Sequence, residues 1–292
     1  HAGASRCHFC ESAPCISADP TRTDIPAFIR AFLDGDESKA YELIRKTNPL
    51  PELTSQLSPA WLENEGACIE TTLTGKAVPI RDLQYSIAWR ARQNGMTGIR
   101  LPKTSSGRKV AVVGGGPTGI AAASRLIELG HAVDLLEQSE RIGGTPSRVI
   151  PVSRLASSRD EIEALLAPAI AALRLKVSTR QTLGTSIALE ELLQNNDAVL
   201  LAIGVWKEAS LNQRCTGVMS GLDFLEASKN GALTTMPSRV AILAGGDSAM
   251  DSAQVAQALG AREIFVLFAG PRSDMHWHMP ESWFATLGVH AM

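Results

Sequence analysis

The chain has 292 residues, enough for about two domains that each bury a core. Its 28 Lys and Arg residues nearly balance its 30 Asp and Glu residues, so nothing in its charge points to nucleic acid as a partner. No apolar run approaches the roughly 20 residues that a membrane helix needs, so we expect no membrane span.

Residues 1–100 are predicted to be helical, because apolar residues recur there at three- and four-residue spacing. The three predicted helices cover residues 25–35, 38–48 and 78–95. Prolines punctuate NPLPELTSQLSP at 48–59, which predicts a connector. The polar segment LPKTSSGR at 101–108 contains Pro and Gly and is predicted to be a linker.

From residue 109 the pattern changes to strand, glycine turn and helix. KVAVVGGG at 109–116 predicts a strand that runs into glycines, and PTGIAAASRLIELG at 117–130 predicts the following helix. Further strands are predicted at 131–138 and 197–204, and 239–268 repeats the strand, glycine, helix and strand plan. The chain is therefore expected to contain two nucleotide-binding α/β units.

Gly114, Gly116 and Gly119 form the first glycine loop, with G-x-G-x-x-G spacing between a strand and a helix. The glycines permit a tight turn and let a pyrophosphate approach backbone N–H groups at the helix N-terminus. Glu137 ends the next strand, where a carboxylate can accept both ribose hydroxyls of an adenosine. The alternative, a glycine-rich turn without a ligand, is disfavoured because the surrounding strand–helix–strand context is complete.

Paired glycines follow Glu137 after five residues, in the sequence RIGG. This E-x5-GG run resembles the FAD-binding pattern of the two-dinucleotide-domain flavoprotein reductases, and 197–204 resembles the strand that ends their first FAD segment. The resemblance implies FAD rather than NAD in the first unit. The residues expected to bind it are Gly114, Gly116, Pro117, Thr118, Gly119, Glu137, Gln138, Gly143, Gly144 and Gly204.

The second glycine loop has Ala244 and Ala249 where the first and third glycines would stand. It is predicted to bind the nicotinamide cofactor, with a degenerate, non-binding duplicate as the alternative. Selection of NADPH usually needs an Arg near the end of the second strand, and the only basic residue there is Arg272. We therefore favour NAD(H) over NADP(H). The predicted contacts are Gly245, Gly246, Asp247, Ser248 and Arg272.

Five cysteines lie at positions 7, 10, 15, 68 and 215. An odd number with three packed into nine residues is a poor disulfide framework and favours metal ligation in a reducing compartment. Cys215 is predicted to be a lone structural thiol.

The order of these motifs resembles the family of the glutamate synthase small subunit and the N-terminal half of dihydropyrimidine dehydrogenase. The resemblance covers essentially the whole chain. The motifs that carry it are the N-terminal cysteine series, TNPLPELT at 47–54, EGAC at 65–68, GGGPTG at 114–119 with Glu137, RIGG at 141–144 and GGDSAMD at 245–251.

The resemblance implies an α-helical iron–sulfur domain followed by an α/β flavoprotein with two Rossmann-like dinucleotide-binding units. The expected bounds are 1–100 for the helical [4Fe-4S] domain, 101–108 for the linker, 109–205 for the first segment of the FAD domain and 206–292 for an incomplete NAD(P) domain. Because family members return to the FAD domain after the nicotinamide unit, we expect the C-terminal part of that domain to be missing, and the chain to be part of a longer subunit.

Family members usually hold two [4Fe-4S] clusters in the helical domain. Asp19, Ser58 and Asn64 fall where the family has cysteine, and Gln84 falls on a glutamine that completes the second cluster in the pyrimidine enzyme. The resemblance therefore implies one lost cluster and one retained [4Fe-4S] cluster. The implied ligands are Cys7, Cys10, Cys15 and Cys68. Zinc on the same thiolates is the alternative.

The implied function is that of a cytoplasmic electron-transfer flavoprotein subunit, which moves electrons between NAD(H), FAD and one [4Fe-4S] cluster. The expected partner is a catalytic redox subunit of glutamate synthase, pyrimidine reductase or aldehyde oxidoreductase type, or a ferredoxin-like iron–sulfur subunit. No residue is predicted to be a general acid or base: His276 and His278 are expected to be packing or surface, and the acidic residues at 160–163 a solvated helix face. The alternatives are a regulatory or scaffold subunit with vestigial nucleotide and zinc sites, and a stand-alone NAD(P)H-dependent reductase.

Overall fold

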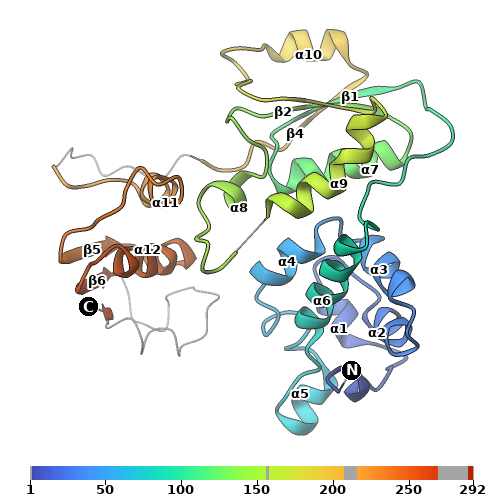
Figure 1. Cartoon of the computed structure of the whole chain (residues 1–292), viewed down its shortest axis with the longest axis horizontal. Helices are drawn as coiled ribbons and strands as arrows, with labels where there is room; N and C mark the ends of the chain where they lie inside the picture. The colour runs from blue at the N-terminus through green and yellow to red at the C-terminus, as the bar shows by residue number, and fades with distance from the viewer. Residues whose placement is uncertain (1, 156–157, 207–215, 269–288, 292) are drawn as a thin grey trace. The chain divides into compact units, whose positions relative to one another are not determined.

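The computed structural model describes residues 2–155, 158–206, 216–268 and 289–291. The chain divides into two compact units, one of residues 1–146 and 157–204 and the other of residues 147–156 and 205–292. Each unit is described separately below, and most of the elements are labelled in Figure 1. The bounds of the four segments expected from the sequence stay a prediction.

The N-terminal part of the first unit is helical, and no strand occurs among described residues 2–100. Its elements are η1 (Ala4–Arg6), α1 (Pro14–Ala18), α2 (Ile25–Leu33), α3 (Glu37–Arg45), α4 (Pro51–Leu57), α5 (Ile69–Thr74) and α6 (Ile80–Gln93). Helices α2, α3 and α6 confirm the three predicted from apolar spacing. The carboxylates of Asp24 and Asp36 cap α2 and α3 by accepting the backbone N–H groups of Ala27 and Lys39. Phe28, at the centre of the helical core, is fully buried.

Helix α4 lies where the sequence predicts a connector, so that prediction is wrong over residues 51–57. The helix begins with Pro51, and Leu50 at its N-cap position offers no capping side chain. Its first free N–H groups are satisfied by the carboxylate of Glu161, which lies more than a hundred residues away along the chain. A local reading of the sequence cannot find such a cap.

The rest of the first unit is a four-stranded parallel sheet with the order β3-β2-β1-β4. The strands are β1 (Lys109–Val113), β2 (Ala132–Leu136), β3 (Leu175–Ser178) and β4 (Ala198–Leu201). The helices are α7 (Pro117–Glu128), α8 (Gly144–Arg148), α9 (Arg159–Ala171) and α10 (Leu189–Asn195). The sequence predicts β1, β2, β4, α7 and a helix face at 160–163 that lies in α9, whereas β3, α8 and α10 are additional. Val112 of β1 lies opposite Leu135 on one side and Leu200 on the other, which fixes the register.

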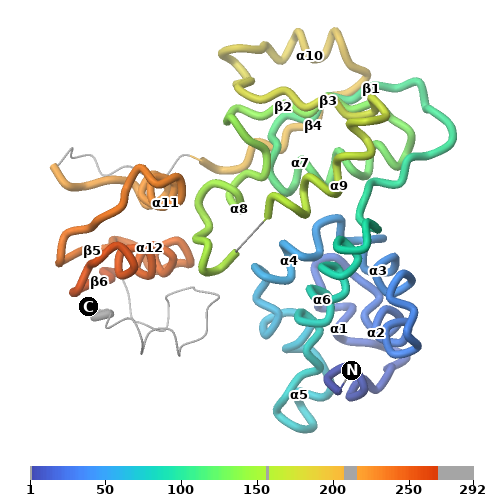
Figure 2. The backbone as a smooth tube through the Cα atoms, in the orientation of Figure 1, coloured from blue at the N-terminus to red at the C-terminus, as the bar shows by residue number. Residues whose placement is uncertain are grey.

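The helical part and the sheet share one hydrophobic core. Leu50, Leu53 and Ile99 from the helical part pack in the same cluster as Val112 of β1 and Ile162 of α9. Figure 2 shows α9 between the first sheet and the N-terminal helices. Glu161 of α9 is only 4% exposed, so the expectation of a solvated helix face at 160–163 is wrong at this residue.

The second unit has a parallel sheet with the order β5-β6-β7. Its described elements are α11 (Gly221–Lys229), β5 (Arg239–Leu243), α12 (Asp247–Ala258), β6 (Glu263–Leu267) and β7 (Val289–Ala291). The predicted strand–glycine–helix–strand plan of 239–268 is confirmed. Residues 147–155 belong to this unit, where Arg154 forms a buried ion pair of 2.7 Å with Asp251. Within the described part of the chain, no helix is both long enough and apolar enough to cross a membrane.

Candidate iron–sulfur and dinucleotide sites

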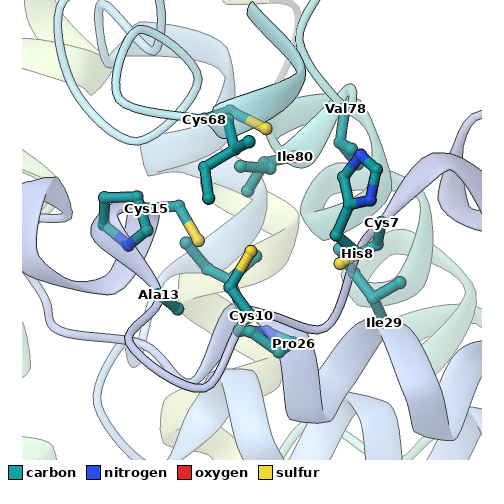
Figure 3. A pocket seen from close by; sticks show the side chains of 13 residues that line it. Cys7, His8, Cys10, Ala13, Cys15, Pro26, Ile29, Cys68, Val78 and Ile80 are labelled. Atoms are coloured by element: carbon teal, nitrogen blue, oxygen red, sulfur yellow. The ribbon is translucent and has the colours of Figure 1, made fainter. Parts of the chain in front are cut away.

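The structure brings four cysteines to one pocket. Cys7, Cys10 and Cys15 come from the loop between η1 and α1 and from α1 itself, whereas Cys68 is the N-cap residue of α5. Figure 3 shows Cys68 on a different segment from the other three, with all four side chains lining the same space. That space measures about 370 Å³ including its open mouth. The rest of its lining is mostly apolar: Ala13, Pro14, Ile25, Pro26, Ile29, Ile69, Val78 and Ile80, with His8.

The cysteine loop has a specific shape. Phe9 takes a left-handed conformation with φ of 51°, which turns the chain between Cys7 and Cys10. The guanidinium of Arg30 lies 4.6 Å from the centre of the Phe9 ring and holds this turn against α2. The backbone N–H of Phe9 also donates to Cys7, a type of contact that orients metal-ligating sulfur.

The pocket disfavours free thiolates. Burial raises the pKa of Cys15 to about 11, and the nearby Cys68 contributes in the same direction. Burial likewise raises the pKa of Cys7, while the hydrogen bond from Phe9 opposes that shift. Thiolates in such surroundings need a positively charged group between them, which is what a metal centre provides.

A polar group beside the pocket is not evident from the sequence. Nε2 of His8 lies 2.6 Å from Oε1 of Glu70, and this hydrogen bond lowers the pKa of the Glu70 carboxyl. Arg6 lies 3.4 Å from the same carboxylate and donates to the carbonyls of Lys76 and Ala77. The three side chains tie the cysteine loop to α5. The His next to Cys7 is a signal in the sequence, but its partner is 62 residues away.

The donor set fits a cluster of metal ions. Four thiols with apolar surroundings suit a [4Fe-4S] cluster, whose irons are each held by one Cys. Among the described residues, no group of three or more His, Cys, Asp or Glu side chains is arranged to hold a single metal ion.

Oxygen-bearing side chains stand where the family would hold its second cluster. Asp19, Asn64 and Gln84 are each at most 6% exposed. Oδ1 of Asp19 accepts from the backbone and the hydroxyl of Thr21, while its Oδ2 has no hydrogen-bond partner among the described residues. Oδ1 of Asn64 is likewise buried and unpartnered in the described structure. Carboxylate and amide oxygens are harder ligands than thiolates, so the absence of cysteine at positions 19 and 64 disfavours a second cluster.

The first glycine loop connects β1 to α7. A Cβ added to Gly119 would lie 1.8 Å from the carbonyl oxygen of Gly114, so only glycine allows this helix start. Gly116 is the N-cap residue of α7 and has no capping side chain, which leaves its first N–H groups available to a ligand. Pro117 is the first residue of the helix, and Thr118 is exposed beside it.

The paired glycines of RIGG meet this loop. The N–H of Gly143 donates to the carbonyl of Gly115 at 2.6 Å. Gly144 has a φ of +56°, and a Cβ added to it would lie 2.8 Å from the Cα of Gly116. The backbones of Gly116 and Gly144 are therefore so close that only glycine fits at position 144. Together they form a surface without side chains at the start of α7, which we call the cradle.

Glu137 is buried at 6% exposure and organises the loop. Its Oε2 accepts the N–H of Gly115 at 2.8 Å, and its Oε1 accepts both the N–H and the hydroxyl of Ser139. A carboxylate has about four acceptor positions, so these three hydrogen bonds leave capacity for a ribose hydroxyl. Gln138 is exposed next to it. Gly204, with a φ of 67°, ends the segment that follows β4.

The second glycine loop connects β5 to α12. Gly246 is the N-cap residue and has no capping side chain, and Asp247 and Ser248 begin the helix. A Cβ added to Gly245 would lie 2.4 Å from the ring of Phe268, so glycine is needed for close packing. The loop therefore has the form of a dinucleotide turn without its first and third glycines. The remaining residues of interest, Arg272, Cys215, His276 and His278, lie outside the described residues.

Comparison with known proteins gives two family matches. Residues 1–96 match the family model described as dihydropyrimidine dehydrogenase domain II, 4Fe-4S cluster. Residues 112–150 match the NAD(P)-binding Rossmann-like domain. An iron–sulfur-type domain therefore precedes a Rossmann-like unit, in the order that the motifs predict.

Three relatives match most of the chain. The glutamate synthase [NADPH] small chain of Azospirillum brasilense is 30% identical over 93% of this chain and 59% of its own length. The NAD-dependent dihydropyrimidine dehydrogenase subunit PreT of Escherichia coli K12 is 30% identical over 89% of this chain and 63% of its own length. The glutamate synthase [NADPH] small chain of Bacillus subtilis 168 is 29% identical over 89% of this chain and 56% of its own length. The predicted resemblance is confirmed, and the chain spans about six tenths of these relatives.

Proposed function

From its homology with glutamate synthase small chains and PreT subunits, we propose that the chain is an electron-transfer oxidoreductase subunit. It would use NAD(H), FAD and one [4Fe-4S] cluster. The observation that carries this proposal is the convergence of four cysteines on one apolar pocket, in a domain that shares its core with a dinucleotide unit. When bound, these cofactors supply hydride exchange between nicotinamide and flavin and single-electron exchange with the cluster.

Cys7, Cys10, Cys15 and Cys68 would hold the cluster. The loop that carries the first three is held by Arg30 on one side and, through Arg6 and His8, by Glu70 on the other. The protein's own contribution is to place the four sulfurs before the cluster arrives and to surround them with apolar side chains. Such surroundings exclude water and tune a cluster's potential.

The FAD would lie at the first glycine loop. What supports FAD over NAD here is the E-x5-GG run, which resembles the FAD-binding pattern of the flavoprotein reductases. The cradle formed by Gly116 and Gly144 would let the diphosphate approach both backbones without meeting a side chain. Glu137 would bind the adenosine ribose and also fix the loop through the N–H of Gly115. Pro117, Thr118 and Gly119 would form the helix start beneath the diphosphate.

The nicotinamide cofactor would lie at the second loop, against Gly245, Gly246, Asp247 and Ser248. We propose NAD(H), because no basic residue other than Arg272 follows the second strand of this unit closely. The names of the relatives include both NADPH-dependent and NAD-dependent proteins, so homology does not choose between the two cofactors.

The electrons would pass to or from a second protein. The relatives carry the names of glutamate synthase and dihydropyrimidine dehydrogenase subunits, so we propose a catalytic redox subunit or a ferredoxin-like subunit as the partner. A cytoplasmic location is proposed because a reducing compartment keeps the four cysteines available as ligands.

The test is to purify the full chain anaerobically and to count iron, zinc and flavin per chain. About four irons per flavin, with the cluster reduced by NADH, is the expected result. About eight irons, the content of two cubanes, would contradict the loss of the second cluster. Zinc without iron, together with no flavin, would replace the proposal with a scaffold role.

A further inference from the structure

Glu161 joins the two parts of the first unit. It lies on α9, beside the first sheet, and only 4% of it is exposed. Its Oε1 accepts the backbone N–H of Glu52 at 2.7 Å, and its Oε2 accepts the backbone N–H of Leu53 at 2.8 Å. One carboxylate of the dinucleotide part thus supplies the cap that α4 lacks in its own sequence.

Helix α4 leads directly into the turn that carries a predicted cluster ligand. It ends at Leu57, and the following turn is closed by N–H groups of Glu65 and Gly66 that donate to the carbonyl of Ala60. That turn ends at Cys68. The turn of residues 58–67 therefore links the end of α4 to Cys68.

Charged and titratable groups surround Glu161 from several elements. Glu52 of α4 is held by Arg92 of α6 through two hydrogen bonds of 2.8 and 3.1 Å. Tyr41 of α3 is buried nearby, and burial raises its pKa to about 12, so it stays neutral. On α9 itself, Asp160 is exposed and lies 3.9 Å from Arg92.

We propose that Glu161 is a positioning residue, which clamps the cysteine-bearing helices onto the first dinucleotide unit and so sets the separation between the cluster and the dinucleotide cofactor. This inference rests on the proposed function for its effect on electron transfer. The clamp itself rests only on the contacts of Glu161, on the shared core that contains Leu53 and Ile162, and on the backbone bond from Ile99 to Leu165.

The clamp has a predictable pH dependence. Burial, followed by the repulsion of Glu52, raises the pKa of Glu161 from its ordinary value of 4.5 to about 8. A carboxyl whose pKa is raised by docking favours separation when it ionises. The equilibrium constant for docking of α4 through Glu161 is therefore largest at low pH. It falls by up to about tenfold per pH unit as pH rises from 4.5 to about 8, and it changes no further above that.

The experiment compares wild type, Glu161→Gln and Glu163→Gln in the full chain, with iron and flavin content measured first. Glu163 is the matched control because it lies on the same helix, is exposed and pairs with Arg159. Amide hydrogen exchange of residues 50–57 is followed from pH 5 to 9 as protection factors, which remove the intrinsic pH dependence of exchange. The rate of cluster reduction by NADH is measured at the same pH values.

In wild type and Glu163→Gln, we expect protection of α4 to fall as pH rises and to level off above about pH 8. In Glu161→Gln, the uncharged side chain should make the protection flat with pH, and the rate of cluster reduction should lose the same pH dependence. Equal pH profiles of protection in wild type and Glu161→Gln would overturn the inference. If the variant does not fold, wild-type protection that does not change with pH would overturn it. A further outcome is that NADH reduces the cluster in none of the three proteins while their protection profiles differ as expected. In that case the proposed function fails, and the clamp by Glu161 is supported.

Discussion

Gly144→Ala tests whether the close approach of two glycines makes the first loop a cofactor cradle. In the native chain, Gly144 has a φ of +56° and lies against Gly116 at the start of α7. A Cβ at this position would be 2.8 Å from the Cα of Gly116 and 3.3 Å from Cδ of Pro117. Both neighbours are backbone or ring atoms that cannot rotate away, so Gly116 itself must move.

Two terms contribute to the loss of unfolding free energy in Gly144→Ala. A left-handed backbone costs an L-residue roughly 1–2 kcal/mol. Forcing a methyl group into a tightly packed contact costs about 1–3 kcal/mol more. Gly184→Ala separates the two terms, because Gly184 has a φ of +81° with nothing within 4 Å of an added Cβ. Gly184→Ala should therefore destabilise the chain by the first term alone, and Gly144→Ala by about 2–5 kcal/mol in total.

The assay is FAD titration of the two flavin-free variants, alongside their unfolding free energies. Displacement of Gly116 should weaken FAD binding by about 5- to 150-fold, the equivalent of 1–3 kcal/mol. Gly184→Ala should bind FAD as wild type does. If both variants lose the same stability and bind FAD equally well, the contact between Gly144 and Gly116 is not part of the cofactor site.

Three further substitutions test the other sites. Cys68→Ser should abolish the cluster but leave flavin in place, so an unchanged iron content would refute its assignment as a ligand. Glu137→Ala frees the N–H of the glycine loop and removes a ribose acceptor, so FAD should bind about tenfold more weakly, and unaltered flavin occupancy would count against this site. Arg154→Ala leaves the buried carboxylate of Asp251 without the guanidinium that lies 2.7 Å from it and should lower the unfolding free energy by about 3–5 kcal/mol in denaturant titrations. Combining Arg154→Met with Asp251→Leu should recover most of that loss, and equal losses in the single and double variants would contradict a buried ion pair.

Local patterns predicted the glycine turns and several of the helices and strands around them. The glycine loops could be located because each spacing encodes a turn that only small residues can make, and the structure confirms this at Gly119. Two of the predicted helices, α2 and α3, carry their own caps, Asp24 and Asp36. The features that were missed depend on partners far along the chain. Helix α4 is capped by Glu161, and His8 pairs with Glu70 across 62 positions. In neither pair does the sequence around one residue indicate its distant partner.

The oxygen-bearing residues at the positions of the expected second cluster affect how electrons would travel. Asp19 and Asn64 each leave a buried acceptor without a partner among the described residues, at a cost of about 1–3 kcal/mol for each such atom. A cysteine at either position would carry no comparable cost, because a buried thiol behaves as a small hydrophobic group. The hard oxygens also bind iron–sulfur clusters poorly. Under the proposed function, one cluster must therefore exchange electrons with both the dinucleotide cofactor and the partner. Every constraint on the Cys68 segment, including the cap that Glu161 gives to α4, then acts on the single point through which the electrons pass.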